Sequence, residues 1–325
     1  ALDAPAEDED LLMPALSTRW RSVFRRPEIV GVLFLLVLTT IWSRHRYGSL
    51  DGGALPTSPE GAIDLWQRYA DSWHNVGMGS SAATPTWIAV LALASTLMFG
   101  KAVFLIATLF LAAPLLLMWS MYSLLRTLTL NSWLAVGASV SYALSPVAIS
   151  SINSGRLGTI AVLILAPQIA RYLPRLAKVE NLEWRFIFGL SFLVGVLTSF
   201  SLSAYLGIAM IYLIGMIYDA RTLRSSGNRE LFNTRLVRRI VLIATPFALC
   251  LPWSLEALVH PSRLLLEPGL VLAGGSSNLA FIANPGGAGS IPWWFVSPVT
   301  LILVVAVFSS TSARKYAEVG LVFLV

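Results

Sequence analysis

The chain has 325 residues, of which 56% are apolar and 12% are charged, and its net charge is +6. Soluble domains carry about 25% charged residues, so this composition excludes an ordinary water-soluble enzyme and favours a protein of the lipid bilayer. The basic residues stand in short clusters between apolar runs, a pattern that encodes membrane topology, and we expect no nucleic-acid partner. The single cysteine, Cys250, lies within an apolar run, which excludes a disulfide framework and a cysteine-based metal site.

The N-terminal residues have the composition of a linker on the cytoplasmic side of a membrane. An acidic cluster over residues 7–10 precedes four arginines over 19–26, and charge runs of this kind are typical of a solvated tail. The first apolar run, 29–42, follows these arginines, which is unlike a secretory signal peptide. Because the last apolar run is cut off by the end of the sequence, we expect a piece of a longer protein. Its parts are a linker over 1–27 and a transmembrane bundle over 28–325, truncated at the C-terminus.

A long and more polar segment over residues 43–101 forms the first predicted outer loop. Within it, apolar and aromatic side chains recur at spacings of three and four over 60–74, which predicts a short amphipathic helix suited to a membrane surface. Residues 87–99 are apolar, but a helix of this length covers only about 20 Å of a ~30 Å hydrocarbon core. We therefore expect 87–99 to lie on the outer face as a surface or re-entrant helix.

The other apolar runs predict a bundle of about eight or nine spans in all. They cover residues 102–125, 132–152, 157–170, 186–200, 202–218, 240–257, 292–309 and a run that begins near 317. If 87–99 does not cross, most of the 23 lysines and arginines fall on the cytoplasmic side, including those of a basic cytoplasmic loop over 219–239. The expected fold is thus an all-α, polytopic transmembrane helix bundle in the plasma membrane, with its N-terminus in the cytoplasm.

Polar residues gather in two predicted outer loops, 43–101 and 258–291, which would enclose a cleft for a polar substrate. Asp51 is the first candidate for a general base, because it follows the first span and precedes two glycines that let a substrate approach. Asp64 is the second candidate. The candidate substrate-binding residues are Arg44, Arg46, Asp71, His74, Arg156, His260 and Arg263. Among them, Arg44, Arg46 and Arg156 are the candidates for binding a phosphate group.

Each of these residues also has a plainer interpretation, which stays open. Asp51 fits a turn residue at an Asp-Gly step, and Asp64 and Asp71 fit the solvated face of the amphipathic helix. The arginines beside the first span fit snorkelling at the interface, and His74 fits an interfacial polar residue. Arg156 fits a turn cap, although a charge at a helix break inside a bundle is often functional. No metal-ligand motif is present, and a divalent cation stays open as a cofactor.

The order of the segments carries a family resemblance. After the acidic outer loop come a short apolar helix that ends at Phe99-Gly100, a span that exits at Leu124-Leu125-Arg126, a span that ends at Ala143-Leu144-Ser145-Pro146 and a break at Gly155-Arg156. This order resembles the type C glycosyltransferase fold of protein mannosyltransferases and arabinosyltransferases. More closely, the segments DLWQRYADSWHNVGMGS (64–80) and NSGRLGT (153–159) resemble the membrane region of large actinobacterial proteins of glycosyltransferase family 2. The resemblance covers most of residues 40–175.

The resemblance implies the membrane portion of a glycosyltransferase that builds cell-envelope glycan. In the type C fold a carboxylate of the first outer loop acts as the base and the donor is a polyprenyl-phosphate sugar, which assigns the base to Asp51 first and to Asp64 second. The implied partners are the lipid bilayer, a lipid-linked sugar donor and a glycan acceptor. Family 2 proteins carry a catalytic domain with an Asp-x-Asp metal site ahead of the membrane region, and this chain contains no such domain. A lipid-linked sugar transporter or flippase, and a non-catalytic membrane anchor of an upstream glycosyltransferase domain, stay open.

Overall fold

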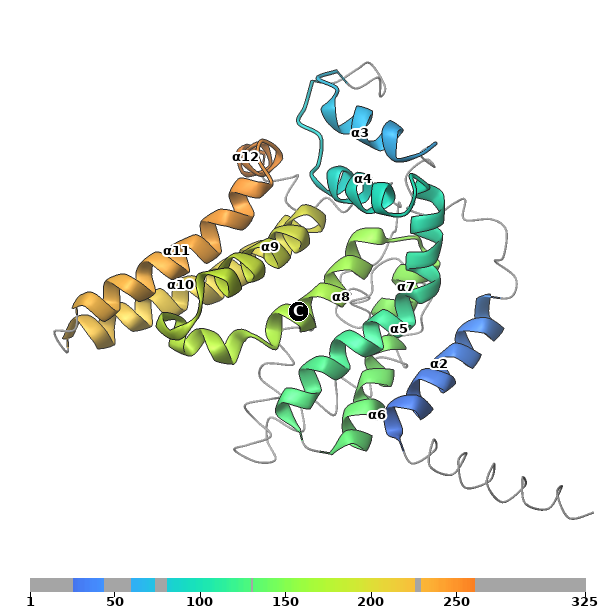
Figure 1. The fold of residues 1–325 in the computed structure, drawn as a ribbon, viewed down its shortest axis with the longest axis horizontal. Coiled ribbons are helices and arrows are strands. Elements are labelled where there is room, and N and C mark those ends of the chain that lie inside the picture. The colour runs from blue at the N-terminus through green and yellow to red at the C-terminus, as the bar shows by residue number, and fades with distance from the viewer. Residues whose placement is uncertain (1–25, 44–59, 74–80, 130, 226–228, 261–325) are drawn as a thin grey trace, which may run out of the picture.

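The computed structural model describes residues 26–43, 60–73, 81–129, 131–225 and 229–260. Every regular element in these ranges is helical, which confirms the all-α prediction (Figure 1). The elements are α2 (Pro27–Ser43), α3 (Ala62–Ala70), α4 (Trp87–Leu97), α5 (Ala102–Leu128), α6 (Ser132–Ala143), α7 (Pro146–Asn153), α8 (Leu157–Ala170), the 3-10 helix η1 (Leu173–Asn181), α9 (Trp184–Phe200), α10 (Leu202–Ser225), α11 (Arg229–Leu249) and α12 (Trp253–Val259). The predicted spans from residue 292 onwards lie outside the described residues.

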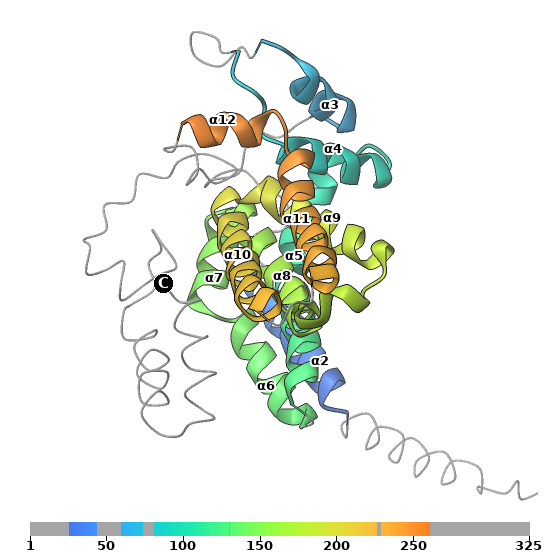
Figure 2. The same ribbon diagram turned by 90° about the vertical axis from the view of Figure 1, so that its left-hand side faces the viewer.

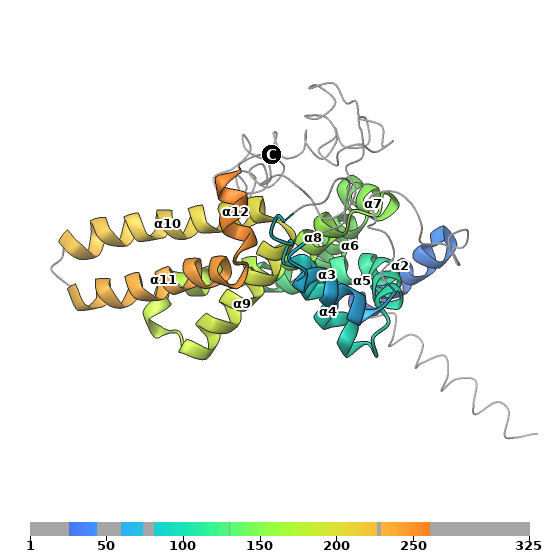
Figure 3. The ribbon, with the colours of Figure 1, turned by 90° about the horizontal axis from the view of Figure 1, so that it is seen from above.

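Successive long helices alternate in direction between two ends of the molecule. In Figure 1, α2, α6, α9 and α11 run upwards, whereas α5, α8 and α10 run downwards. α4 lies across the upper end, with α3 beyond it, in both this view and the view turned by 90° (Figure 2). Seen from above, α10 and α11 form a pair that projects from the other helices (Figure 3). We call the end covered by α3 and α4 the capped end, and the opposite end, with η1 and the junction of α10 and α11, the basic end.

The described residues contain two helices that are long and apolar enough to cross a bilayer, α5 and the part of α10 over Leu202–Arg221. The pair α6 and α7 would form a third, although the two helices bend by 42° at their junction. α2, α4, α8 and α9 are apolar but shorter. The 17 residues of α9 form about 25 Å of helix, less than a ~30 Å hydrocarbon core, so helix lengths alone do not establish eight or nine spans.

Buried apolar side chains hold the helices together in three clusters. One cluster joins η1 with α9, α10 and α11, a second joins α3 and α4 to α5 and α8, and a third joins α2 to α5, α6 and α7. Large apolar side chains also cover the outer surface, and Phe104, Phe192 and Ile214 are each more than half exposed. An apolar surface of this extent is unfavourable in water and is expected where lipid surrounds the helices.

The basic segment 219–239, which we expected to be a loop, is mostly helical. α10 continues to Ser225, and α11 begins at Arg229. The physical reason is that positions three and four apart share one face of a helix, and Arg235, Arg238 and Arg239 on this face of α11 have partners on α10 and at the end of η1. The end of α10 and the start of α11 lie at the basic end (Figure 1).

Four charged side chains at the basic end pair with one another and form what we call the ion-pair network: Glu180, Asp219, Arg235 and Arg239. Arg235 lies 2.9 Å from the Glu180 carboxylate and 3.0 Å from that of Asp219, and Arg239 lies 2.9 Å from Asp219. Arg238 donates to three backbone carbonyl oxygens at and just after the end of η1, at 2.5–2.8 Å. These contacts tie η1, α10 and α11 together.

The predicted span 240–257 is divided into two helices. α11 ends at Leu249 and α12 begins at Trp253, directly after Pro252, whose nitrogen has no hydrogen to donate to a helix. α12 then turns across the capped end (Figures 1 and 2).

Candidate functional site

Three hydrogen bonds between distant parts of the chain hold the capped end together. The backbone N–H of Ala62, at the start of α3, donates to the carbonyl of Gly100 at 2.9 Å. The hydroxyl of Thr86, just before α4, donates to the carbonyl of Cys250 at 3.3 Å. The N–H of Ala83 donates to the carboxylate of Glu256 at 2.7 Å. The cap is thus attached to α5 on one side and to the corner of α11 and α12 on the other.

The amphipathic helix predicted over 60–74 is present as α3. Its buried side chains are Ala62 and Leu65, and Leu65 packs in the cluster that also contains Leu157 of α8. Full burial of one leucine contributes about 1.5–3 kcal/mol, so this contact fastens α3 to the bundle. Ile63 and Trp73 point away from the protein, with 75% and 60% of their surfaces exposed. α3 therefore presents apolar side chains to its surroundings, as a helix at a membrane surface does.

The first turn of α3 engages both oxygens of Asp64, the second candidate base. Oδ1 accepts a hydrogen bond from Arg68 Nε at 3.0 Å. Oδ2 accepts the backbone N–H of Glu60 at 3.2 Å and lies 2.8 Å from Arg68 Nη2. Asp64 is thus held in place by a guanidinium group on one side and a backbone N–H on the other. Before Asp64 could take a proton from an acceptor, one of these partners would have to move.

The other described candidates lie around the capped end. Asp71 is exposed and ends α3, where its N–H donates to the Gln67 carbonyl at 2.8 Å. Arg156 is half-buried between α7 and α8, directly after Gly155, whose φ of 70° is a left-handed conformation that glycine adopts without strain. His260 is exposed at the end of α12. The remaining candidates, which lie outside the described residues, are Arg44, Arg46, Asp51, His74 and Arg263.

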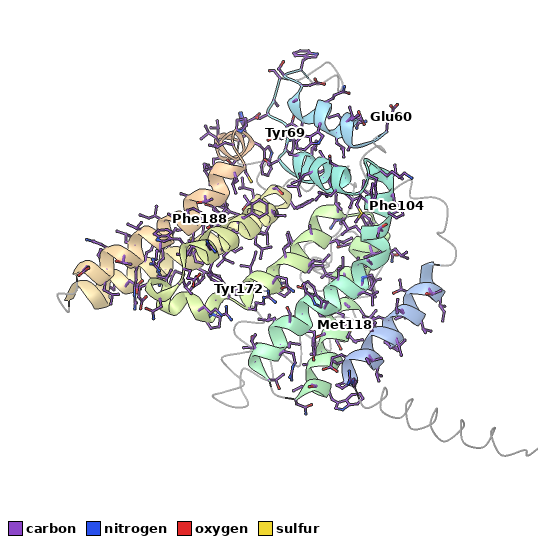
Figure 4. The ribbon with its side chains drawn as sticks, viewed as in Figure 1. Glu60, Tyr69, Phe104, Met118, Tyr172 and Phe188 are labelled. Carbon is purple, nitrogen blue, oxygen red and sulfur yellow. The ribbon has the colours of Figure 1, made fainter. Side chains whose placement is uncertain are left out.

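An open groove of about 460 Å³ lies where α5 begins, and its walls are of two kinds. Glu60 and Lys101 supply a carboxylate and an ammonium group at the edge of the cap. Val103, Phe104 and Ala107 extend the groove along the outer surface of α5 with apolar side chains. Figure 4 shows Glu60 and Phe104 on the same side of the molecule. A groove that is charged at one end and apolar along its length suits an amphiphilic molecule with a polar head.

Neither Glu60 nor Lys101 is among the candidate site residues predicted from the sequence. The two meet because the chain returns at Gly100 to the residue before α3: a Cβ at Gly61 would lie 3.1 Å from the Gly100 carbonyl oxygen. The local signal for this return is the pair Phe99 and Gly100, both of which have positive φ values, 56° and 78°. Phe99 is 94% exposed, so packing of its side chain does not explain its positive φ. The tight turn itself is the reason for this conformation.

The described ranges hold no group of three or more His, Cys, Asp or Glu side chains placed to bind a metal ion.

In comparisons with known proteins, no family model, no curated protein and no solved structure matches this chain.

Proposed function

We propose that the chain is the membrane portion of a glycosyltransferase that acts in cell-envelope glycan synthesis. In this proposal it is a polytopic protein of the plasma membrane, its N-terminus faces the cytoplasm, and its capped end faces outwards. The donor is a polyprenyl-phosphate sugar and the acceptor is a glycan hydroxyl. The observation that carries the proposal is the groove at the start of α5, with its charged head and apolar wall.

The groove suits a lipid phosphate in two respects. Lys101 precedes the first turn of α5, where unpaired backbone N–H groups and the helix dipole add to the positive potential of its ammonium group. Val103 and Phe104, exposed in that same first turn, would offer an apolar path for the polyprenyl chain in the plane of the bilayer. The sugar would then lie under the cap, within reach of the acidic residues that precede and begin α3.

The distribution of charge supports the outward orientation of the capped end. Arg68, Lys101 and Arg156 are the basic side chains on the capped-end elements that the structure describes. The arginines of η1, of the start of α9, of the end of α10 and of the start of α11 lie towards the other end (Figure 1). Basic residues are retained on the cytoplasmic side of a membrane, so the basic end is assigned to the cytoplasm.

The reaction needs one base and one anionic leaving group. A carboxylate removes the proton of the acceptor hydroxyl, the oxygen attacks the anomeric carbon, and the bond to the lipid phosphate breaks with its electron pair on the phosphate. Asp51 is the first candidate for this base. Asp64 is the second, and its carboxylate is already engaged by Arg68 and by the Glu60 N–H. Glu60, which lines the groove, is a third candidate for the base, suggested by its position in the structure.

The test is sugar transfer by the full-length protein in proteoliposomes, supplied with a panel of radiolabelled polyprenyl-phosphate sugars and cell-envelope glycan acceptors. Removing the base, by Asp51→Asn or Glu60→Gln, is expected to lower kcat by about 10²–10⁴-fold. Lys101→Met is expected to raise KM for the donor, and Arg126→Met, at the far end of α5, serves as the matched control for loss of a charge. Normal sugar transfer by a variant that combines Asp51→Asn, Asp64→Asn and Glu60→Gln would contradict the catalytic proposal. It would favour a non-catalytic membrane anchor of an upstream glycosyltransferase domain.

A transporter for the same lipid-linked sugar is the second candidate. It requires ionisable side chains facing one another deep in the spans. In the described helices the buried ion pairs belong to the ion-pair network, which lies at the basic end rather than midway. Movement of labelled lipid across the vesicle bilayer without sugar transfer would favour this candidate over the enzyme.

A further inference from the structure

A second concentration of positive charge, which the proposed function does not use, lies where α8 meets η1 at the basic end. Arg171 directly follows α8, and Arg175 lies one turn later in η1. Both guanidinium groups approach the ring of Tyr172: the Cζ atoms of Arg171 and Arg175 lie 4.5 Å and 5.7 Å from its centroid. Phe186 of α9 packs edge-on against the same ring at 5.3 Å. We call Arg171, Tyr172, Arg175 and Phe186 the arginine-pair site.

The two guanidinium groups lack a compensating carboxylate. Within the described ranges neither Arg171 nor Arg175 has an acidic group within ion-pair distance. Glu180, the acidic residue of η1, is engaged by Arg235 instead. Arg171 donates to the hydroxyl of Tyr172, but its buried Nε finds no hydrogen-bond partner among the described residues. The site therefore holds two like charges around one ring and leaves a donor unused.

The dipole of α8 does not balance this charge. The carbonyl end of a helix carries about half a negative charge, which favours one nearby cation, and two arginines leave an excess of about 1.5 positive charges. Cation–π contact with Tyr172 holds the groups in place but does not neutralise them. An anion with several acceptor oxygens would do so and would also use the free N–H donors. A phosphate group has this chemistry, and arginine binds it by paired hydrogen bonds.

The neighbouring side chains place the arginine-pair site at the level of lipid headgroups. On α9, next to Phe186, Trp184 and Phe188 are 44% and 52% exposed, and their rings stack at 5.9 Å. Exposed tryptophan beside an apolar helix is typical of a membrane interface. Figure 4 shows Tyr172 and Phe188 on neighbouring elements. Further along α9, Phe192 is 58% exposed. A molecule bound at the arginines would have an apolar surface beside it for its chains.

We propose that the arginine-pair site binds the phosphate headgroup of an anionic membrane lipid in the leaflet at the basic end. The site lies at the opposite end of the bundle from the groove, so this inference does not depend on glycosyl transfer. It predicts one bound lipid that is selected for its charge.

The test is lipid binding to the full chain in a neutral detergent, followed by native mass spectrometry with dioctanoyl phosphatidylglycerol and, in parallel, dioctanoyl phosphatidylcholine. The test variant combines Arg171→Gln with Arg175→Gln. The matched control combines Arg185→Gln with Arg221→Gln, which removes the same charge from exposed arginines at the same end. Because a charge-assisted hydrogen bond contributes a factor of ten or more, phosphatidylglycerol is expected to bind the test variant at least about tenfold more weakly. The control should bind within about threefold of the parent, since exposed charges act weakly.

Four outcomes decide the inference. Loss of binding in the test variant alone, with weak binding of phosphatidylcholine to the parent, supports it. An equal loss of phosphatidylglycerol binding in both double variants would show only unspecific attraction between charges and would overturn the inference. Competition by inorganic phosphate at the same concentration as the lipid would assign the site to a soluble anion and overturn the lipid assignment. If the test variant does not fold, Arg175→Gln alone, at an exposed position, is expected to weaken binding by about threefold, and unchanged binding overturns the inference.

Discussion

Replacement of Asp219 by asparagine is the sharpest test of how the basic end is held together. Asp219 is almost fully buried, with 4% of its side chain exposed. Its Oδ1 accepts a hydrogen bond from Arg235, and its Oδ2 lies 2.9 Å from Nη2 of Arg239. Burial lowers the pKa of Arg235, but its hydrogen bonds to Glu180 and Asp219 outweigh this effect and raise the pKa above its usual value. The arginine therefore stays charged, and Asp219→Asn leaves two buried cations facing a neutral amide.

The expected loss of stability follows from the partners that remain. Removing one member of a buried ion pair costs about 3–5 kcal/mol because the other charge is left without compensation. Arg235 keeps Glu180, whereas Arg239 keeps no carboxylate within the network, so we expect about 3 kcal/mol. Arg239 has little room to escape, because its guanidinium fills the space beside Gly215, where an added Cβ would lie 1.9 Å from Nη1.

The measurement is the unfolding midpoint of the purified chain in mixed micelles of dodecyl maltoside and sodium dodecyl sulfate, followed by circular dichroism. Asp64→Asn is the matched control, because it makes the same change in a more exposed pair between residues four apart on one helix, with 26% of the Asp64 side chain and 42% of the Arg68 side chain exposed. Such pairs contribute about 0.3–0.5 kcal/mol, so the control should shift the midpoint far less. If both variants unfold at the same point, the ion-pair network does not stabilise the basic end and our assignment is wrong.

Three further predictions concern the helices and the cap. Gly31→Ala should be about 1–3 kcal/mol less stable than Gly137→Ala in the same unfolding assay. Both substitutions raise helix propensity, but only at Gly31 would the added Cβ lie 2.6–2.7 Å from side chains of α5 and α6. Glu256→Ala removes the acceptor of a backbone N–H and should speed hydrogen exchange over 81–86 by about tenfold without affecting α9. With the single cysteine replaced by serine, Lys101→Cys should react with an impermeant thiol reagent on intact cells and Thr127→Cys should not; the reverse result would show that 87–99 crosses the membrane.

Features that depend on neighbouring residues could be predicted from the sequence. The spacing of Ile63, Trp66, Gln67 and Ala70 indicated α3, because side chains three or four residues apart share one face of a helix wherever the helix lies. The shortness of 87–99 separated it from the spans by length alone, and α4 does lie across the bundle (Figure 2). The side of the membrane that α4 occupies stays a prediction, because the packing of the helices does not distinguish the two sides of the bilayer.

Features that depend on distant residues could not be predicted. Residues 219–239 were expected to be a loop because a segment with six arginines resembles a solvated one. Nothing in the local sequence shows that Asp219 and Glu180 lie on adjacent helices, where they pair with Arg235. The role of Glu256 was equally hidden, since its partner, the N–H of Ala83, lies 173 residues away in the chain. The same holds for the groove, whose two charged residues are brought together by the bond between Ala62 and Gly100.

The two ends of the bundle differ in how they are held, and the difference bears on function. The basic end is fixed by buried ion pairs, each of which is costly to break. The cap is attached by single hydrogen bonds, such as that of Thr86 to the Cys250 carbonyl, each with a net contribution of about 1 kcal/mol, and by the burial of a few leucines. Local opening follows the weakest attachments, so α3 and α4 are expected to separate from α5 before any span does. If the proposed function holds, a donor with a polyprenyl chain would enter from the side, within the bilayer. The groove at Lys101 lies between the cap and α5, where that separation would admit it.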